Sequence, residues 1–375
     1  MSKVDNARIL YVYADNALEK FYCSNWLCSF PAYALDRAGY AVGMAPIDEF
    51  VKKPRPADLY IVERLLWNGS DSVIYDKMPK GPTRGRVERL ANLKVLDRIV
   101  ELQAKGSKVA AVFDDHYAAY PRDTDIAEPA ALWLDGRLDD TYIGYNPLEH
   151  FKNGLGIVNA VFSPSKYLLD FYVEDKSKAY HVHNRPNLDI WQRFAGAWVS
   201  EDDKVRVGWS GTAQHVTGWQ ESGIVDVLRA LKDKIVLVGV MSGDKMLDMV
   251  EKSGVEHRIQ RPVPFEQFPD VVRSYDIGIC PLGGEYDKGR SWIKWLECSL
   301  AGKPVVAQDH AGVYDECHGG YLVKTKEDWI DALSYLIECE EEYRLMSEAG
   351  RAWAWAQGWD ENLSELTSIF EEILE

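Results

Sequence analysis

The 375-residue sequence contains only six cysteines, and none of them forms a C-x-x-C pair or another spacing typical of metal ligands. It also lacks an apolar run of the roughly 20 residues that a membrane-spanning helix requires. The N-terminus, MSKVDNARILYVYA, has no signal-peptide core and leads directly into a predicted strand. These absences predict reduced thiols, no metal site and a soluble, cytoplasmic protein.

Positive charge is scarce as well. The chain has 43 Lys and Arg against 59 Asp and Glu, a net charge of −16, which argues against a broadly basic nucleic-acid surface. Residues 77–108 are the exception, because nine Lys and Arg face three acidic residues there. This segment is either a solvated helix face with paired charges or a docking patch for a phosphate-bearing acceptor. In the second case Arg84, Arg86 and Arg89 are the acceptor-binding candidates.

Three common motifs are missing. No G-x-G-x-x-G follows the first predicted strand, no Walker loop is present, and GWSGT at 208–212 lacks the last glycine of G-x-S-x-G. A nicotinamide dinucleotide site, a Walker-type nucleotide site and a serine hydrolase are therefore poorly supported. We expect no cofactor.

Short apolar runs alternate with helical patterns along the whole chain, which predicts an α/β fold with parallel sheets covered by helices on both faces. The length favours two such sheets in succession, with a break near 184–204. We therefore predict domains at 1–190 and 191–350, and a C-terminal helix within 351–375 that packs across both. The predicted strands are 7–14, 41–45, 58–63, 108–114, 160–165, 178–184, 204–210, 234–240, 275–282, 303–309 and 321–324.

The stretch GRSWIKWLECSLAGKPVVA, residues 289–307, combines polar and apolar signals. Ser291, Lys294 and Glu297 follow one another at intervals of three on a predicted helix between two strands. Ser291 is expected to cap the helix, Lys294 to attract a diphosphate, and Glu297 to accept hydrogen bonds from two ribose hydroxyls. The alternative is a capped surface helix with a Lys–Glu pair. The strand–helix–strand context favours a nucleotide site, because open α/β sheets bind ligands at the carboxyl ends of their strands.

With these segments the sequence resembles the retaining nucleotide-sugar glycosyltransferases of the GT-B fold, of the family-4 type. The resemblance covers about residues 160–375, and the R-S-x-x-K-x-x-E arrangement is similar to a sub-branch common in viral and bacterial genomes. It implies two Rossmann-like domains facing a cleft, the first binding the acceptor and the second the donor, and no metal ion. The matching segments are VFSPSKYLLDFY (161–172), HNRPNLDIW (183–191), ICPLGG (279–284), the helix through Glu297, SLAGKPVVAQDHAG (299–312) and DECHGGYLV (315–323).

The resemblance also implies roles for single residues. Glu297 would hold the donor ribose, while Ser291 and Lys294 would face the diphosphate. Gly289 stands where the family has a second glutamate, and Thr217–Gly218 stand where a Lys–Gly pair is expected.

Other cations must then neutralise the leaving diphosphate. We expect Arg290, Lys294 and His215 to supply the charge. Gly211 and Thr212, in the same loop as His215, are further donor-binding candidates.

In the first half, VAAVFDDHYAAYP (109–121) ends a predicted strand with Asp114, Asp115 and His116, which are our catalytic candidates. A carboxylate there could orient the acceptor hydroxyl or take its proton. Asp114 stands where many relatives have histidine. The alternative is an Asx turn that caps the next segment.

The sequence thus predicts transfer of a sugar from a nucleoside-diphosphate sugar to an acceptor hydroxyl. A glycan, or a lipid- or protein-linked sugar, is the expected acceptor. A hydroxylated base in DNA is the alternative, and it would use the basic 77–108 segment. A non-catalytic nucleotide-sugar-binding protein and a sugar-nucleotide epimerase are further alternatives.

Overall fold

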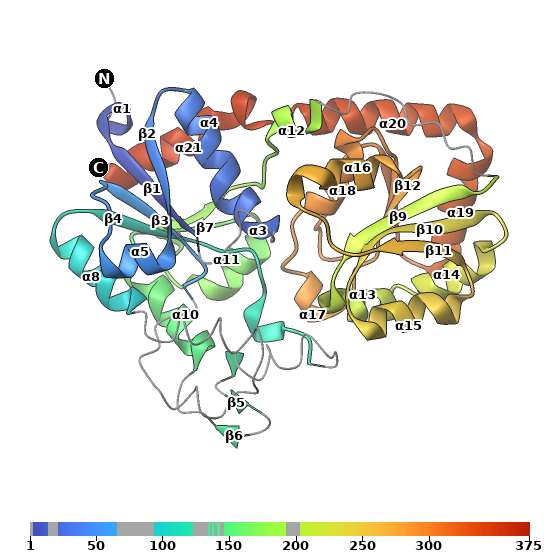
Figure 1. The fold of residues 1–375 in the computed structure, drawn as a ribbon, viewed down its shortest axis with the longest axis horizontal. Helices are drawn as coiled ribbons and strands as arrows, with labels where there is room; N and C mark the ends of the chain where they lie inside the picture. Colours follow the sequence, from blue (N-terminus) through green and yellow to red (C-terminus); the bar gives the residue numbers. More distant parts are fainter. Residues whose placement is uncertain are drawn as a thin grey trace. The chain divides into compact units, whose positions relative to one another are not determined.

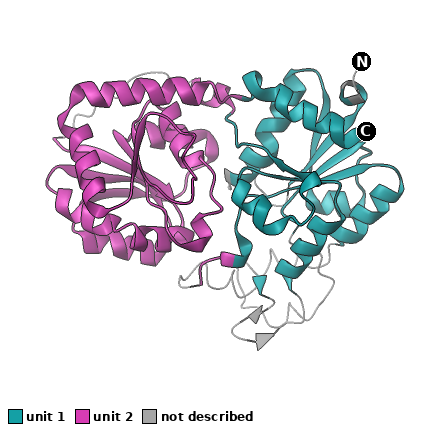
Figure 2. Ribbon diagram, turned by 180° about the vertical axis from the view of Figure 1, so that it is seen from behind, with its two compact units in different colours: residues 1–118, 129–186, 359–375 teal, residues 119–128, 187–358 magenta. Residues whose placement is uncertain are grey.

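The computed structural model describes residues 3–13, 22–65, 94–122, 134–135, 137–138, 141–142, 146–192 and 203–375. The chain forms two compact units (Figure 2): residues 1–118, 129–186 and 359–375 make up unit 1, and residues 119–128 and 187–358 make up unit 2. Each unit contains a six-stranded parallel sheet flanked by helices (Figure 1). The predicted α/β fold with two Rossmann-like domains is confirmed.

Unit 1 has the strand order β2-β1-β3-β4-β7-β8. Two of its inner strands, β3 and β7, are buried throughout, as their largely apolar sequences predict. The strands are β1 (Arg8–Tyr13), β2 (Ala41–Pro46), β3 (Leu59–Glu63), β4 (Lys108–Val112), β7 (Ala160–Ser163) and β8 (Ala179–His181), and the two-residue strands β5 (Arg137–Leu138) and β6 (Thr141–Tyr142) pair separately. The helices are α1 (Lys3–Asn6), α3 (Tyr22–Ser24), the π-helical turn η1 (Asn25–Ser29), α4 (Phe30–Arg37), α5 (Ile47–Lys52), α8 (Val95–Ala104), α10 (Pro147–Ile157), α11 (Lys166–Tyr172), η3 (Lys176–Lys178) and α21 (Trp359–Leu374). The short turn η2 (Tyr117–Ala119) lies where the chain passes from unit 1 to unit 2.

Unit 2 has the strand order β11-β10-β9-β12-β13-β14. The strands are β9 (Val205–Gly211), β10 (Ile235–Met241), β11 (Glu256–Gln260), β12 (Ile277–Cys280), β13 (Val305–Gln308) and β14 (Gly320–Val323). The helices are α12 (Leu188–Gln192), η4 (Ala213–His215), α13 (Val216–Glu221), α14 (Ile224–Leu231), α15 (Asp244–Ser253), η5 (Phe265–Gln267), α16 (Phe268–Arg273), α17 (Gly284–Asp287), α18 (Ile293–Leu300), α19 (Lys326–Glu338) and α20 (Glu340–Trp355).

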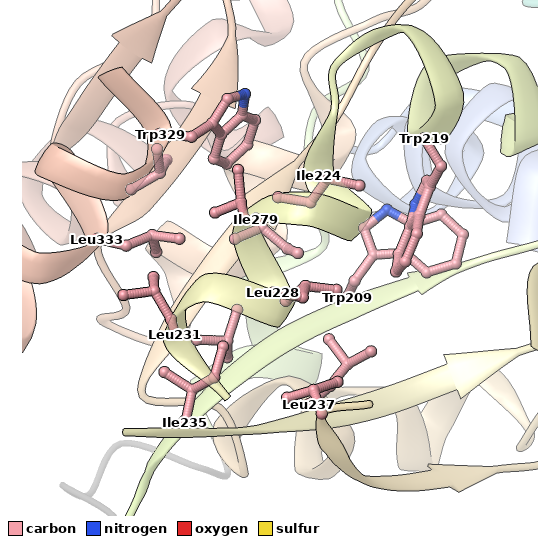
Figure 3. Packing of buried hydrophobic residues seen from close by; sticks show 14 of the residues in the cluster. Trp209, Trp219, Ile224, Leu228, Leu231, Ile235, Leu237, Ile279, Trp329 and Leu333 are labelled. Carbon is pink, nitrogen blue, oxygen red and sulfur yellow. The ribbon is translucent and has the colours of Figure 1, made fainter. Parts of the chain in front are cut away.

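A large apolar cluster forms much of the core of unit 2 (Figure 3). Every residue of β10 is buried, and α14 adds Ile224, Leu228 and Leu231 at helical spacing. Trp209 and Trp219 lie together at one end of this cluster, with their ring centroids 5.1 Å apart. Two indole rings therefore pack against each other near the carboxyl end of β9.

The last two helices belong to different units. Helix α20 packs on α18 and α19 in unit 2, whereas α21 packs on α1 and α4 in unit 1. The chain returns to unit 1 through residues 356–358. Coverage of the second domain by the C-terminal helix stays a prediction. In the described part of the chain, none of the helices combines the length and the apolar composition of a membrane span.

Candidate functional site

The predicted helix of the 289–307 stretch is α18, which connects β12 to its parallel neighbour β13. The chain reaches it from the carboxyl end of β12 through α17. The prediction that Ser291 caps this helix is wrong, because α18 begins at Ile293 and Trp292 is its N-cap residue. Ser291 comes one residue too early, because the first backbone hydrogen bond of the helix runs from the Leu296 N–H to the Trp292 carbonyl (2.9 Å).

Glu297 and Lys294 lie on α18 beside the end of β9. Glu297 is buried, with 8% of its surface exposed. Lys294 donates a hydrogen bond to the carbonyl of Ser210, and its ammonium lies 5.1 Å from the centroid of a Trp209 ring. Burial raises the pKa of Glu297 to about 8, although Lys294 acts to lower it. Burial also lowers the pKa of Lys294.

Arg290 is held by three neighbours in the same region. Its Nε lies 3.4 Å from Asp287 Oδ1, its Nη2 donates to His215 Nε2 at 3.4 Å, and its guanidinium lies 4.3 Å from the centroid of the Tyr286 ring. Asp287 Oδ1 also lies 3.5 Å from His215 Nδ1. Arg290, Lys294 and Glu297 are predicted to bind the donor, and for that prediction they are hereafter called the donor cradle.

The protonation states of His215 and Asp287, which lie beside the donor cradle, follow from burial and from the neighbouring charges. Burial, and then Arg290, lower the pKa of His215 to about 4, so its imidazole is neutral at pH 7. Burial acts to raise the pKa of Asp287, but His215 and Arg290 offset this and the pKa falls below its ordinary value. His215 lies beside the cradle as predicted, yet it adds no charge. The positive charges are those of Arg290 and Lys294.

Gly211 is the last residue of β9, and Thr212 connects this strand to η4. A Cβ on Gly211 would come within 2.6 Å of the Trp209 ring, so this close approach requires glycine. Thr212 is exposed, and its carbonyl accepts a hydrogen bond from the His215 N–H (3.1 Å). Both residues thus directly precede η4, the short helix that ends at His215.

The three catalytic candidates follow β4 in unit 1. Asp114 and Asp115 both contact the guanidinium of Arg64, with Nη2–Oδ distances of 3.1 and 3.4 Å. His116 is 1% exposed, and its Nδ1 lies 2.9 Å from the hydroxyl of Tyr172. The two carboxylates are therefore grouped by one cation, whereas His116 belongs to a buried aromatic cluster.

Sequence reasoning missed Arg64 and Asp287. Arg64 directly follows a buried strand, the same signal that drew attention to Asp114. Asp287 lies three residues before Arg290, at the spacing of a helical pair. The acceptor candidates Arg84, Arg86 and Arg89 lie outside the described residues. Among the described side chains, no group of three His, Cys, Asp or Glu is arranged to hold a metal ion.

Comparison with known proteins gives the fold. No protein-family model and no curated protein matches the sequence. The catalytic domain of starch synthase IV from Arabidopsis thaliana, solved with ADP and acarbose, matches with a TM-score of 0.65 at 11% identity, over 98% of this chain and 99% of that one. An α-glucosyltransferase (AGT) solved with UDP matches with a TM-score of 0.62 at 12% identity, over 98% and 100%. Anabaena HepE, solved with UDP and glucose, matches with a TM-score of 0.58 at 12% identity, over 96% and 99%.

The chain has the GT-B fold. Its two Rossmann-like sheets are the two domains of that fold. The donor cradle belongs to the second GT-B domain, and the carboxylates of Asp114 and Asp115 belong to the first.

Proposed function

We propose that this chain is a glycosyltransferase that moves a sugar from a nucleoside-diphosphate sugar to an acceptor hydroxyl, with retention of the anomeric configuration. The donor cradle carries this proposal, because it combines a buried carboxyl group with two basic side chains where β12 leads into α18. Open α/β sheets bind their ligands at such carboxyl ends of strands. Retention follows from the resemblance of residues 289–307 to the family-4 enzymes.

In this proposal each member of the cradle has one task. Glu297 accepts hydrogen bonds from the two ribose hydroxyls of the donor. Lys294 and Arg290 face the diphosphate and stabilise the negative charge that grows on it as the bond to the sugar breaks. Asp287 and Tyr286 hold the Arg290 guanidinium in place for this task.

The acceptor hydroxyl is oriented by Asp114 and Asp115. We propose a glycan, or a lipid- or protein-linked sugar, as the acceptor. The net charge of −16 supports a neutral acceptor over DNA. In the described part of the basic 77–108 segment, Arg98 and Lys105 both pair with Glu101, as on a solvated helix face.

A thermal-shift assay against UDP-, GDP-, ADP-, TDP- and CMP-sugars tests the donor site. We expect one nucleotide class to raise the melting temperature of the wild type, and Glu297→Ala and Lys294→Ala to abolish the shift. Glu338→Gln is the matched control, because Glu338 is an exposed glutamate of α19 that pairs with Lys234. No shift with any donor would contradict the proposal.

Turnover separates the enzyme from a binding protein. Hydrolysis or transfer of the bound donor by the wild type, lost in Glu297→Ala, would exclude the non-catalytic alternative. A DNA acceptor predicts that DNA binding weakens steeply with salt. Transfer to hydroxymethylated DNA, or salt-dependent binding to it, would contradict the proposed acceptor class.

A further inference from the structure

Arg64 has an unusual backbone conformation for a residue with a long side chain. Its φ is +49°, in the left-handed region that glycine adopts without strain. Its N–H donates to the carbonyl of Val112 (2.9 Å), so the strained residue is fixed against the end of β4. Strain of this kind persists only where the surrounding structure holds it and is common at functional sites.

The Arg64 guanidinium joins carboxylates from two strand ends. Its Nη2 lies 3.1 Å from Asp114 Oδ1 and 3.4 Å from Asp115 Oδ2, and its Nε lies 3.8 Å from Glu63 Oε1. Glu63 is fully buried and also accepts a hydrogen bond from the Ser24 hydroxyl (2.5 Å). Burial acts to lower the pKa of Arg64, but Asp114, Asp115 and other nearby acidic groups together outweigh this and raise it. The guanidinium is thus a permanent cation.

The exposure of these side chains separates their roles. Glu63 has no exposed surface, whereas the side chains of Asp114 and Asp115 are 10% and 15% exposed. Glu63 therefore anchors the cluster from inside, and the two aspartates form its accessible edge. A single Nη2 serves both of them, so the position of Arg64 fixes the spacing between the two carboxylates.

We propose that Arg64 is a positioning residue that holds Asp114 and Asp115 in the geometry needed to orient the acceptor hydroxyl. This inference rests on the proposed function. In the transfer, the bond between the anomeric carbon and the diphosphate oxygen breaks, and a bond to the acceptor oxygen forms. The acceptor proton leaves with the nucleoside diphosphate. A carboxylate paired with a guanidinium is suited to accept the hydrogen bond of the hydroxyl, and it does not need to keep the proton.

The test uses water as the acceptor, so that no glycan has to be known. Hydrolysis of UDP-glucose and ADP-glucose is measured for the wild type, Arg64→Gln, Arg64→Lys and Asp114→Asn, together with the affinity of UDP and ADP. We expect Arg64→Gln to lower kcat at least tenfold while the KM of the donor and the affinity of the nucleotide stay unchanged. Arg64→Lys should keep part of the wild-type kcat. Its ammonium has the same charge but lacks the planar set of N–H donors of the guanidinium.

A double variant shows whether Arg64 acts through Asp114. If it does, Arg64→Gln combined with Asp114→Asn should be no slower than the slower single variant. Losses that multiply, or wild-type turnover by Arg64→Gln, would overturn the inference. If Arg64→Gln fails to fold, the double variant is built with Arg64→Lys and read in the same way. Absence of nucleotide binding by the wild type would instead overturn the proposed function, and the role of Arg64 with it.

Discussion

Binding of the donor should release a proton from Glu297. Burial places the pKa of this carboxyl at about 8, so only roughly a tenth of the free protein carries the carboxylate at pH 7. In the proposed function two ribose hydroxyls donate to Glu297, and hydrogen bonds to the charged form favour ionisation. Donor binding and loss of this proton are therefore linked.

The size of the effect follows from the same pKa. If only the ionised form binds, the Kd of a nucleotide sugar falls about tenfold per pH unit between about pH 6 and 7.5, and it levels off above about pH 8. Roughly 0.9 proton is released per donor bound at pH 7. Burial lowers the pKa of Lys294, so this residue acts in the opposite direction. Glu297→Gln removes the part of the pH dependence that comes from the carboxyl group.

Isothermal titration calorimetry measures both quantities. The Kd is followed against pH, and the proton count comes from two buffers that differ in ionisation enthalpy. The ligand is a nucleotide sugar and not a nucleoside diphosphate. The terminal phosphate of a nucleoside diphosphate titrates at about pH 6, as a phosphate monoester does, and its own protons would enter the count. A flat profile for the wild type, or the same slope in Glu297→Gln, would refute the link between Glu297 and the donor.

Three further predictions concern stability and donor affinity. The folded pKa of Glu297, about 8, lies above its ordinary 4.5, so its contribution to stability is complete below pH 4.5 and is lost as the pH rises through 8. Urea unfolding measures the free energy of unfolding of both proteins. Relative to the wild type, that of Glu297→Gln should therefore rise by roughly 2 to 4 kcal/mol between about pH 5 and pH 9. Asp287→Asn removes the carboxylate that contacts the cradle guanidinium, and calorimetry should show donor binding weakened about tenfold. Gly208→Ala would place a Cβ 1.9 Å from the Tyr275 ring and should lower the free energy of unfolding by about 3 kcal/mol or more. Gly156→Ala, where the added Cβ meets nothing within 4 Å, is the control that should be neutral or stabilising.

The sequence predicts most of the fold because burial leaves a clear pattern. All eleven predicted strands are present, most of them with ends that differ by one or two residues. Sequence reasoning missed the two-residue strands β5 and β6 and, in the six-stranded sheet of unit 2, β11, which reads EHRIQ and alternates between exposed and half-buried residues. It lies at the edge of its sheet and pairs only with β10. Charged residues are common on edge strands because they discourage further pairing, and they also hide such a strand from a search for apolar runs.

Only part of the candidate site could be predicted from the sequence. Lys294 and Glu297 could be predicted because a spacing of three within one helix is a local property. The contact of Arg64 with Asp114 joins residues fifty positions apart, and it exists because β3 pairs with β4 so that Glu63 lies opposite Val112. The sequence shows polar residues after each strand, but the order of strands decides which cation meets which carboxylate.

The region around the donor cradle departs from the pattern of the family-4 glycosyltransferases that the sequence resembles. Thr217 and Gly218 stand where the resemblance implies a Lys–Gly pair. In the structure a Cβ on Gly218 would lie 2.5 Å from Asp287 Oδ2, so the glycine is still required, now by a buried carboxylate. Asp287 contacts Arg290, whose guanidinium also reaches His215 in the loop after β9. Arg290, in the segment before α18, thus places beside this loop the positive charge that Thr217 lacks. Loss of the basic pair is therefore compatible with a working diphosphate site, and it does not by itself favour a non-catalytic protein.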